Sequence, residues 1–361
     1  MIVLHTESSL GWGGQENRTF NEMLGLRERG HTALLACPPG ARLGARAREA
    51  GFTVFETPMR SAVDLPAMLR LRRFMAEQRP DVVNTHSSRD TQLAGMAARL
   101  LARRPRLVRT RHLALPITSK FTYRVLPDHV VTVSRHVENA LVRAGVPREH
   151  ITTVHTGIDF SRYDRALVKG DLREALGLPA DTLLIGTVAI LRRKKGHAEL
   201  LEAVPAVLER FPDAHFVFAG DGPQHANIER RIAALQLSEH VHLLGLRRDV
   251  VNVLASLDLF VLPTHQEALG TAFVEAGAMG LACIGTNVDG VPEVINDGET
   301  GLLVPVHDPA ALAQAIIALL ADPARRRAMG EAASRHVRQK FSREAMVGGM
   351  VAVYERLLGQ R

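Results

Sequence analysis

Cysteine and aromatic residues are scarce in this chain of 361 residues. Its two cysteines, Cys37 and Cys283, each lie in an apolar run. This pattern excludes the disulfide framework of a small secreted domain and is typical of buried thiols in a reducing compartment. Aromatic residues make up 4% of the chain, against 46% for all hydrophobic residues. Leucine, valine, isoleucine and alanine must therefore fill the cores, and the length favours two domains.

Long apolar runs are absent as well. No stretch approaches the ~20 uninterrupted apolar residues that a membrane-spanning helix needs. The opening residues MIVLHTESSL have no basic segment and too short an apolar run for a signal peptide. We therefore expect a cytoplasmic protein, either free or peripheral on the inner face of the cytoplasmic membrane.

Motifs that define several other classes of protein are also missing. The glycine-rich residues 11–20, GWGGQENRTF, carry Glu16 where the dinucleotide fingerprint G-x-G-x-x-G requires glycine, which disfavours a dehydrogenase. No G-x-x-x-x-G-K-[ST] loop is present. The 16 histidines form no H-E-x-x-H motif and no cluster with zinc spacing, and no D-x-D is present. We expect no bound metal and no cofactor.

Positive charge is concentrated in the first half of the chain. Residues 1–165 carry 25 Lys and Arg against 15 Asp and Glu, a formal charge of +10, whereas residues 166–361 carry 20 against 23, or −3. One interpretation is a set of solvated arginine-rich faces. The other is contact with an anionic membrane surface, a phosphorylated acceptor or nucleic acid. Nucleic acid is the least favoured partner, because the basic residues are not interleaved with aromatics and no nucleic-acid-binding motif is present.

Short β-branched runs alternate with amphipathic helical patterns, and the alternation restarts midway. This predicts an α/β fold of two doubly wound, Rossmann-like units with mostly parallel sheets, residues 1–165 and 166–342, joined through the polar stretch 159–182. Seven strands are predicted in the first half and six in the second. Parallel sheets bind ligands at the carboxyl ends of their strands, so functional motifs are expected directly after strands.

Two such motifs follow strands of the second half. Arg192, Arg193 and Lys195 lie in RRKKG, before a helix, where cations can neutralise a diphosphate. Glu267 follows the buried run LFVLPT, and Glu275 lies about one turn inside the next predicted helix, so the two carboxylates bracket a helix N-terminus. The alternatives are a basic surface loop and two solvated glutamates.

The first half offers weaker candidates. Gly13 and Gly14 precede a helix after the opening strand, where a backbone can approach phosphate; a tight turn is the alternative. His86 and His112 fall at strand ends, although a structural role is the more common outcome for a single histidine. With Arg89 and Asp90, which follow His86 closely, they are the candidates for the acceptor side.

In this order and spacing, the motifs resemble the retaining glycosyltransferases of family 4, which have the GT-B fold. The resemblance covers nearly the whole chain. Its most specific parts are the stretch PTHQEALGTAFVEAGAMG, which is similar to the family's E-x7-E segment, the run from Pro292 to Val304, and KKGHAELLEA. GGQE and VHTGIDFSRY are similar to two further family segments.

The resemblance implies an active site in the cleft between the two domains and a role for each matching residue. Glu275 should hold the ribose hydroxyls and Glu267 the donor sugar. Gly14, with Gly13 beside it, should lie near the phosphates, and His112 near the transferred sugar. The catalytic set implied is Glu267, His112, Lys195 and Arg192. Lys195 matches the diphosphate lysine, and the backbone amides expected at the sugar or β-phosphate are those of Leu269, Gly270 and Thr271. The final helix, within 343–361, should pack back on the first domain.

The sequence departs from the family pattern at several positions. Ala189-Ile190-Leu191 stands where the family has G-R-L, so Arg192 is the expected substitute for the missing arginine, with Arg193 second. Ala268 and Leu269 replace the usual glycine and aromatic of E-G-F-G, and Thr156 replaces the usual asparagine.

The resemblance implies a metal-independent transferase that moves a sugar from a nucleotide diphosphate sugar to a hydroxyl, with retention at the anomeric carbon. A UDP-sugar is favoured over GDP-mannose, and the acceptor is a glycan or a lipid-linked glycan, as in lipopolysaccharide, capsule or O-antigen assembly. Two alternatives remain: a UDP-sugar epimerase of the same fold and a non-catalytic nucleotide-binding module.

Overall fold

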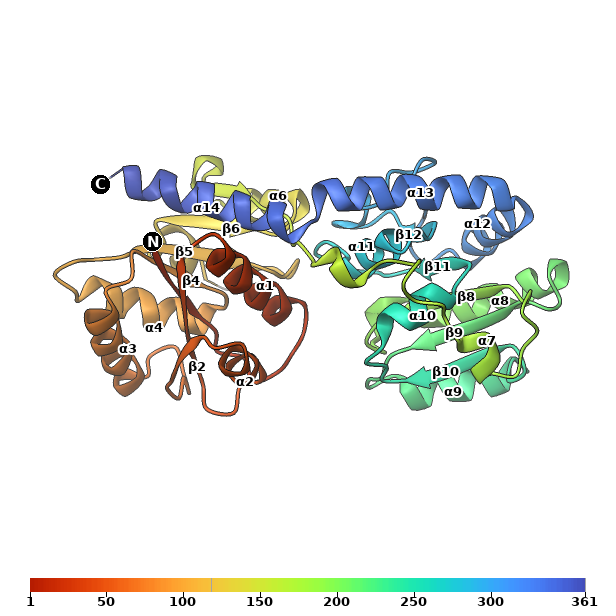
Figure 1. Ribbon diagram of the computed structural model, residues 1–361, viewed down its shortest axis with the longest axis horizontal. Coiled ribbons are helices and arrows are strands. Elements are labelled where there is room, and N and C mark those ends of the chain that lie inside the picture. Colours follow the sequence, from red (N-terminus) through yellow and green to blue (C-terminus); the bar gives the residue numbers. More distant parts are fainter. Residues whose placement is uncertain (118, 361) are drawn as a thin grey trace. The chain divides into compact units, whose positions relative to one another are not determined.

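The computed structural model describes residues 1–117 and 119–360, and the chain folds as two compact units (Figure 1). The first unit holds Met1–Ile158 together with the chain from Phe341 onward, and the second unit holds Asp159–Lys340.

The division therefore lies seven residues before the predicted one. The guanidinium of Arg165 donates to the carbonyl oxygens of Ala255 and Leu257, at 3.3 and 3.1 Å, so the segment before it packs with the second unit. The carbonyl of Phe341 accepts the N–H of Ile158 at 3.0 Å, which places Phe341 in the first unit.

The first unit is built on a parallel seven-stranded sheet of order β3-β2-β1-β4-β5-β6-β7. Its strands are β1 (Ile2–Thr6), β2 (Thr32–Cys37), β3 (Thr53–Glu56), β4 (Val82–Thr85), β5 (Arg106–Arg111), β6 (His129–Thr132) and β7 (Ile151–Thr153). Its helices are α1 (Gly14–Glu28), α2 (Arg42–Glu49), α3 (Leu65–Gln78), α4 (Ser88–Arg99), α5 (Phe121–Arg124), α6 (Arg135–Arg143), the 3-10 turn η1 (Arg148–His150) and α14 (Arg343–Gly359).

Both faces of this sheet are buried. Val3 packs with α1, α2 and α14, whereas its neighbour Leu4 packs with α3 and α4 on the other face. Because successive side chains of a strand point to opposite faces, strands covered on both sides read as continuous apolar runs. This explains why the strands were recognisable in the sequence.

The last helix, α14, lies alongside α1 (Figure 1). Gly25 of α1 permits the approach, since a Cβ there would lie 2.5 Å from Val347. The phenol of Tyr354 donates to the buried Glu22 of α1 at 2.6 Å. The C-terminal segment thus packs on the first unit; Arg361, at the end of the predicted range, lies outside the described residues.

The second unit has a parallel six-stranded sheet of order β10-β9-β8-β11-β12-β13. Its strands are β8 (Leu184–Val188), β9 (His215–Ala219), β10 (Val241–Gly245), β11 (Leu259–Leu262), β12 (Cys283–Thr286) and β13 (Gly301–Val304). Its helices are α7 (Leu172–Ala175), α8 (His197–Arg210), α9 (His225–Ala234), α10 (Val250–Ser256), α11 (Thr271–Ala278), α12 (Pro309–Ala321) and α13 (Pro323–Lys340), with the 3-10 turns η2 (Phe160–Arg162), η3 (Arg193–Lys195) and η4 (Val291–Glu293).

The predicted fold of two parallel-sheet α/β units is confirmed, and every predicted strand is present. Cys37 and Cys283 are buried free thiols. Over residues 1–117 and 119–360, no helix combines the length and the apolar character that crossing a bilayer requires.

Candidate functional site

Each sheet changes winding direction at one pair of neighbouring strands. In the second unit these are β8 and β11, and in the first unit β1 and β4. The loops that follow such a pair part to opposite sides and leave room for a ligand at the carboxyl edge of the sheet. The predicted site residues of each unit follow these strands and their neighbours.

Lys195 and Glu267 meet at the edge formed by β8 and β11. Their side chains form an ion pair, and only 17% and 19% of the respective side-chain surfaces are exposed. Lys195 ends the short turn η3 after β8, and Glu267 lies in the loop after β11. Two residues separated by 72 positions are thus held together, as their predicted roles at one ligand require.

The backbone fixes the loop of Lys195 against the loop of Glu267. Gly196 adopts φ +72°, and a Cβ there would lie 1.8 Å from the carbonyl oxygen of Pro263, so only glycine allows this approach. The carbonyl of Lys194 accepts two hydrogen bonds from the other loop, from Thr264 Oγ1 at 3.0 Å and from the His265 N–H at 2.7 Å.

Glu267 is also held from its other side by the loop after β12. Its N–H donates to Asp289 Oδ2 at 3.0 Å, and its carbonyl accepts the N–H of Gly290 at 3.1 Å. A Cβ on Gly290 would lie 2.2 Å from the carbonyl oxygen of Ala268. Both backbone groups of Glu267 are therefore engaged, which leaves its carboxylate for Lys195 and a ligand.

Helix α11 begins directly after this loop. Gly270 caps it in the left-handed region at φ +95°, and Thr271 is its first residue. Among the described residues, the N–H groups of Leu269, Gly270 and Thr271 have no backbone partner. A helix N-terminus with free N–H groups can bind an anion, which is the role predicted for these amides.

Glu275 lies inside α11 and is partly buried, and its carboxyl group is a weaker acid than an ordinary glutamate. Desolvation raises its pKa from the ordinary 4.5 to about 7, and a hydrogen bond from the Tyr163 phenol acts in the opposite direction. Tyr163 directly follows η2, in the polar stretch that was predicted to be a linker.

Arg192 and Arg193 are exposed and line an open cavity of about 980 Å³ in the second unit. The cavity is strongly basic: its other cationic and imidazole residues are Lys194, His197, Arg230, Arg231, His265 and His307. The structure thus pairs Lys195 with Glu267, and it places Arg192 and Arg193 at the cavity. Of the residues predicted at the diphosphate, Arg192 and Arg193 line this cavity, whereas Lys195 is not among its lining residues.

In the first unit, Gly13 is the N-cap of α1, and Gly14 is the first residue of that helix. The N–H of Gly13 donates to the side chain of Glu16, Oε2, at 2.8 Å, which satisfies one N–H group at the start of the helix. Glu16, which broke the dinucleotide fingerprint, therefore has a structural function.

His86 and His112 lie in one line of histidines with His5 of β1. His112 Nε2 lies 3.0 Å from His86 Nδ1, and His86 Nε2 lies 3.2 Å from His5 Nδ1. Burial holds the pKa of all three imidazoles below the ordinary value. The three rings are therefore neutral near pH 7, and His112, 8% exposed, is the nearest to solvent.

The remaining acceptor-side candidates have different environments. Asp90 is fully buried, and its carboxylate accepts from Thr6 Oγ1 and the N–H groups of His86 and Ser87. It caps α4 and holds it against β1, which corrects its assignment to the acceptor side, because a saturated, buried carboxylate has no position left for an acceptor. Arg89 is exposed and donates to the carbonyl of Met59 at 3.1 Å.

One carboxyl group at this edge was not among the residues predicted from the sequence. Glu7 directly follows β1 and is fully buried. Desolvation, together with the neighbouring Asp90, raises its pKa to about 8. Gln15 Nε2 donates to Glu7 Oε2 at 2.5 Å, which ties the end of β1 to the start of α1. The only available signal was its position one residue after a strand.

Two family models match the chain. Residues 12–162 match the model of Glycosyltransferase Family 4, and residues 168–336 match that of Glycosyl transferases group 1. Together the two models span most of the chain.

Two relatives of known function are similar to this chain. N-acetyl-alpha-D-glucosaminyl L-malate synthase of Bacillus anthracis is 32% identical over 63% of this chain, which spans 59% of that protein's length. UDP-Gal:alpha-D-GlcNAc-diphosphoundecaprenol alpha-1,3-galactosyltransferase of Escherichia coli is 28% identical over 72% of this chain and 71% of its own.

Solved structures show the same fold. A glycosyltransferase of Rickettsia africae superposes with a TM-score of 0.89, at 24% identity, over 99% of this chain and 98% of its own. The Anabaena protein HepE, solved with UDP and glucose, superposes with a TM-score of 0.85, at 20% identity, over 99% of this chain and 100% of its own.

The chain belongs to the glycosyltransferases of family 4 and has the GT-B fold. The membership expected from the E-x7-E segment and its neighbouring motifs is confirmed.

Proposed function

We propose that this protein transfers a sugar from a nucleotide diphosphate sugar to a hydroxyl group of a glycan or lipid-linked acceptor, with retention at the anomeric carbon. The donor binds the second unit and the acceptor binds the first. The proposal rests above all on the pairing of Lys195 with Glu267 at the carboxyl edge of the second sheet.

The second unit offers a complementary group for each part of such a donor. Lys195, Arg192 and the N-terminal amides of α11 stabilise the negative charge that develops on the departing diphosphate, an electrostatic role that needs no divalent metal. Glu267 accepts hydrogen bonds from the sugar, and Glu275 from the ribose. His112 of the first unit is assigned to the transferred sugar from the family resemblance alone, and the acceptor proton passes to the departing phosphate.

A UDP-sugar is the favoured donor. The galactosyltransferase of E. coli acts with UDP-Gal, and the Anabaena structure holds UDP. A relative from Corynebacterium glutamicum, 34% identical over 55% of this chain, is named as GDP-mannose-dependent. GDP-mannose is therefore the second candidate donor.

The acceptor we propose is a lipid-linked glycan at the inner face of the cytoplasmic membrane, in lipopolysaccharide, capsule or O-antigen assembly. The E. coli relative acts on a diphosphoundecaprenol-linked sugar, and a Staphylococcus aureus relative serves capsular polysaccharide biosynthesis. The basic first half suits such an anionic partner.

The donor proposal is tested first by ligand binding. UDP, GDP, ADP and their sugars are added to the full chain, and the melting temperature is recorded, since a ligand of the native state raises it. We expect the largest rise with UDP and its sugars. No rise with any nucleotide would contradict the proposal.

The assignment of the ion pair is tested with Lys195→Met and Glu267→Gln. Loss of Lys195 should lower kcat on the order of 10²- to 10³-fold, the cost of removing one electrostatic contact to the leaving group. Lys169→Met, at an exposed lysine of the same unit, is the matched control. Unchanged turnover in Glu267→Gln would contradict the proposed contact between Glu267 and the donor sugar.

Product analysis separates transfer from the two alternatives. With donor alone, an epimerase would change the sugar of the donor, and a binding module would leave the donor intact even when an acceptor is present. We expect a glycosylated product only when an acceptor is supplied.

A further inference from the structure

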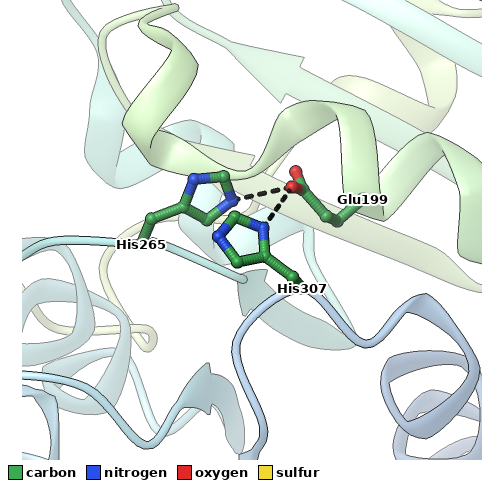
Figure 2. A group of neighbouring side chains, drawn as sticks. All are labelled: Glu199, His265 and His307. Carbon is green, nitrogen blue, oxygen red and sulfur yellow. Dashed lines mark hydrogen bonds and ion pairs between the residues drawn. The ribbon is translucent and has the colours of Figure 1, made fainter.

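Glu199, His265 and His307 form a compact cluster in the second unit (Figure 2). His265 Nε2 lies 2.8 Å and His307 Nδ1 lies 3.0 Å from the same atom, Glu199 Oε1. The two imidazole rings lie beside each other, with their centroids 4.0 Å apart. One ligand atom from each residue lies within 4.8 Å of the others. Three potential metal ligands therefore converge on one point.

The three residues come from different segments, and each is held in place. Glu199 is the third residue of α8. His265 follows β11, and its N–H is bonded to the carbonyl of Lys194. His307 adopts φ +60°, and the next residue, Asp308, caps α12 through the N–H of Ala311 at 2.9 Å. A left-handed conformation costs a non-glycine residue roughly 1–2 kcal/mol, and such strain concentrates at functional positions.

Two imidazole nitrogens and one carboxylate oxygen are the donor set of zinc sites that keep an open position. Zinc bonds of ~2.0–2.1 Å in a tetrahedron separate ligand atoms by roughly 3.3 Å. The observed separations of 2.8 and 3.0 Å need to open by only a few tenths of an ångström. Glu199 Oε2 is buried and has no hydrogen-bond partner among the described residues, so one carboxylate oxygen is still available.

Access to the cluster is open on one side. The His265 and Glu199 side chains are 19% and 17% exposed, whereas that of His307 is 64% exposed and the cluster borders the basic cavity. A metal ion can enter from solvent past His307, and water can complete its coordination.

We propose that Glu199, His265 and His307 bind one divalent transition-metal ion, with zinc the favoured ion. Imidazole and carboxylate ligands suit zinc, and the transfer proposed above assigns no role to these three residues, so no step of it depends on the ion. It joins the start of α8, the loop after β11 and the loop before α12. Because His265 stands two residues before Glu267, the ion also fixes the loop that carries Glu267. This effect matters for sugar transfer only if the proposed function of Glu267 is correct.

The binding test uses the full chain without a polyhistidine tag, stripped of metal by a chelator and titrated with zinc chloride by calorimetry. We expect one zinc ion per chain. Loss of a residue that merely supports a metal ligand costs on the order of 10- to 100-fold in affinity, so Glu199→Gln and His307→Gln should each cost at least tenfold. His307 is exposed, so its variant keeps the fold while it tests the site.

The matched control is His242→Gln. His242 of β10 contacts His215 at 2.9 Å, a second histidine cluster of the same unit in which no carboxylate is hydrogen-bonded among the described residues. This variant should bind zinc as the unaltered protein does. No zinc binding, or equal binding by the Glu199→Gln and His307→Gln variants, overturns the proposal.

Hydrogen exchange tests the effect on the loop. Zinc should slow amide exchange in residues 264–268 of the unaltered protein but not of Glu199→Gln. Zinc binding without this protection would overturn the loop-fixing role and leave the site standing. Both measurements are made without donor or acceptor, so failure of the transferase proposal would not alter either result.

Discussion

At the scale of single residues, Glu275 shows how burial and function are coupled at this site. Its carboxyl group is partly buried on α11, and its one described partner is the phenol of Tyr163. Desolvation disfavours the ionised form, so the pKa is raised to about 7. A nucleotide that brought ribose hydroxyls to this carboxylate would supply the hydrogen bonds that its ionised form lacks.

The raised pKa of Glu275 predicts a pH dependence of stability. Because the native state holds the proton more tightly than the unfolded state, the contribution is fully present below about pH 4.5 and is lost as the pH rises to about 7. Glu275→Gln, neutral throughout, should lack this component, which is on the order of 2 kcal/mol. Urea unfolding at pH 5 and pH 8 measures it, with Glu331→Gln, at an exposed position of α13, as control. Equal pH dependence in both variants would contradict the assignment.

At the scale of elements, a buried hydroxyl contributes hydrogen bonds to the attachment of α14, beside the apolar packing of that helix. Tyr354 donates to Glu22 Oε1 at 2.6 Å and accepts from Asn84 Nδ2 at 2.8 Å. Tyr354→Phe would remove both of these buried hydrogen bonds and leave Asn84 Nδ2 and Glu22 Oε1 only their mutual contact at 3.3 Å, so the free energy of unfolding should fall by about 1–3 kcal/mol.

Tyr123→Phe is the control for this change. Tyr123 is 1% exposed, and its hydroxyl has no hydrogen-bond partner among the described residues. Its removal should cost less than about 0.5 kcal/mol. Denaturant unfolding of both variants makes the comparison, and similar losses would show that the hydrogen bonds of Tyr354 do not hold α14 in place.

The loop after β8 gives a second prediction at this scale. Gly196→Ala combines a left-handed φ of +72° with a Cβ only 1.8 Å from the Pro263 carbonyl oxygen. Gly298→Ala has a similar φ of +77°, but its Cβ would meet no atom within 4 Å. The control should lose roughly 1–2 kcal/mol from the backbone alone, and Gly196→Ala at least about 1 kcal/mol more from the forced displacement. Equal losses of stability in the two variants, measured by thermal unfolding, would mean that the loop after β8 can move away from Pro263 without an energetic cost.

The elements and part of the site could be predicted from the sequence because the signals are local. A strand such as β4 is a short apolar run that ends at polar residues, and Glu267 could be placed because it directly follows such a run. Its meeting with Lys195 follows from the rule that the carboxyl ends of parallel strands share one edge.

Other contacts could not be predicted because they depend on how distant segments pack. Glu199, His265 and His307 are separated by long stretches of chain, and no spacing rule joins residues of α8, the loop after β11 and the loop after β13. Tyr163 lies in a polar segment that reads as linker, and only the fold brings its hydroxyl to Glu275.

At the scale of the whole molecule, charge and exposed apolar surface coincide on α3. Arg72 and Arg73 are exposed on this helix, near Leu65 and Leu69, which are 57% and 49% exposed. Both guanidinium groups have partners at the surface, since Arg72 donates to the carbonyl of Leu100 at 3.1 Å and Arg73 pairs with Glu77 of the same helix at 2.9 Å. Basic and apolar side chains together are the pattern of a helix that lies on an anionic membrane surface.

If α3 contacts an anionic membrane surface, removing the charges of Arg72 and Arg73 should weaken vesicle binding. Each basic residue near an anionic surface contributes about 1 kcal/mol, so Arg72→Ala with Arg73→Ala should bind phosphatidylglycerol vesicles on the order of 30-fold more weakly at low salt. The charge-matched control is Arg325→Ala with Arg327→Ala, at exposed positions of α13 in the second unit, which should bind as the unaltered protein does. Co-sedimentation at two salt concentrations measures both, because screening should abolish the difference. Equal weakening by the two double variants would show that net charge, and not the surface of α3, governs the attraction.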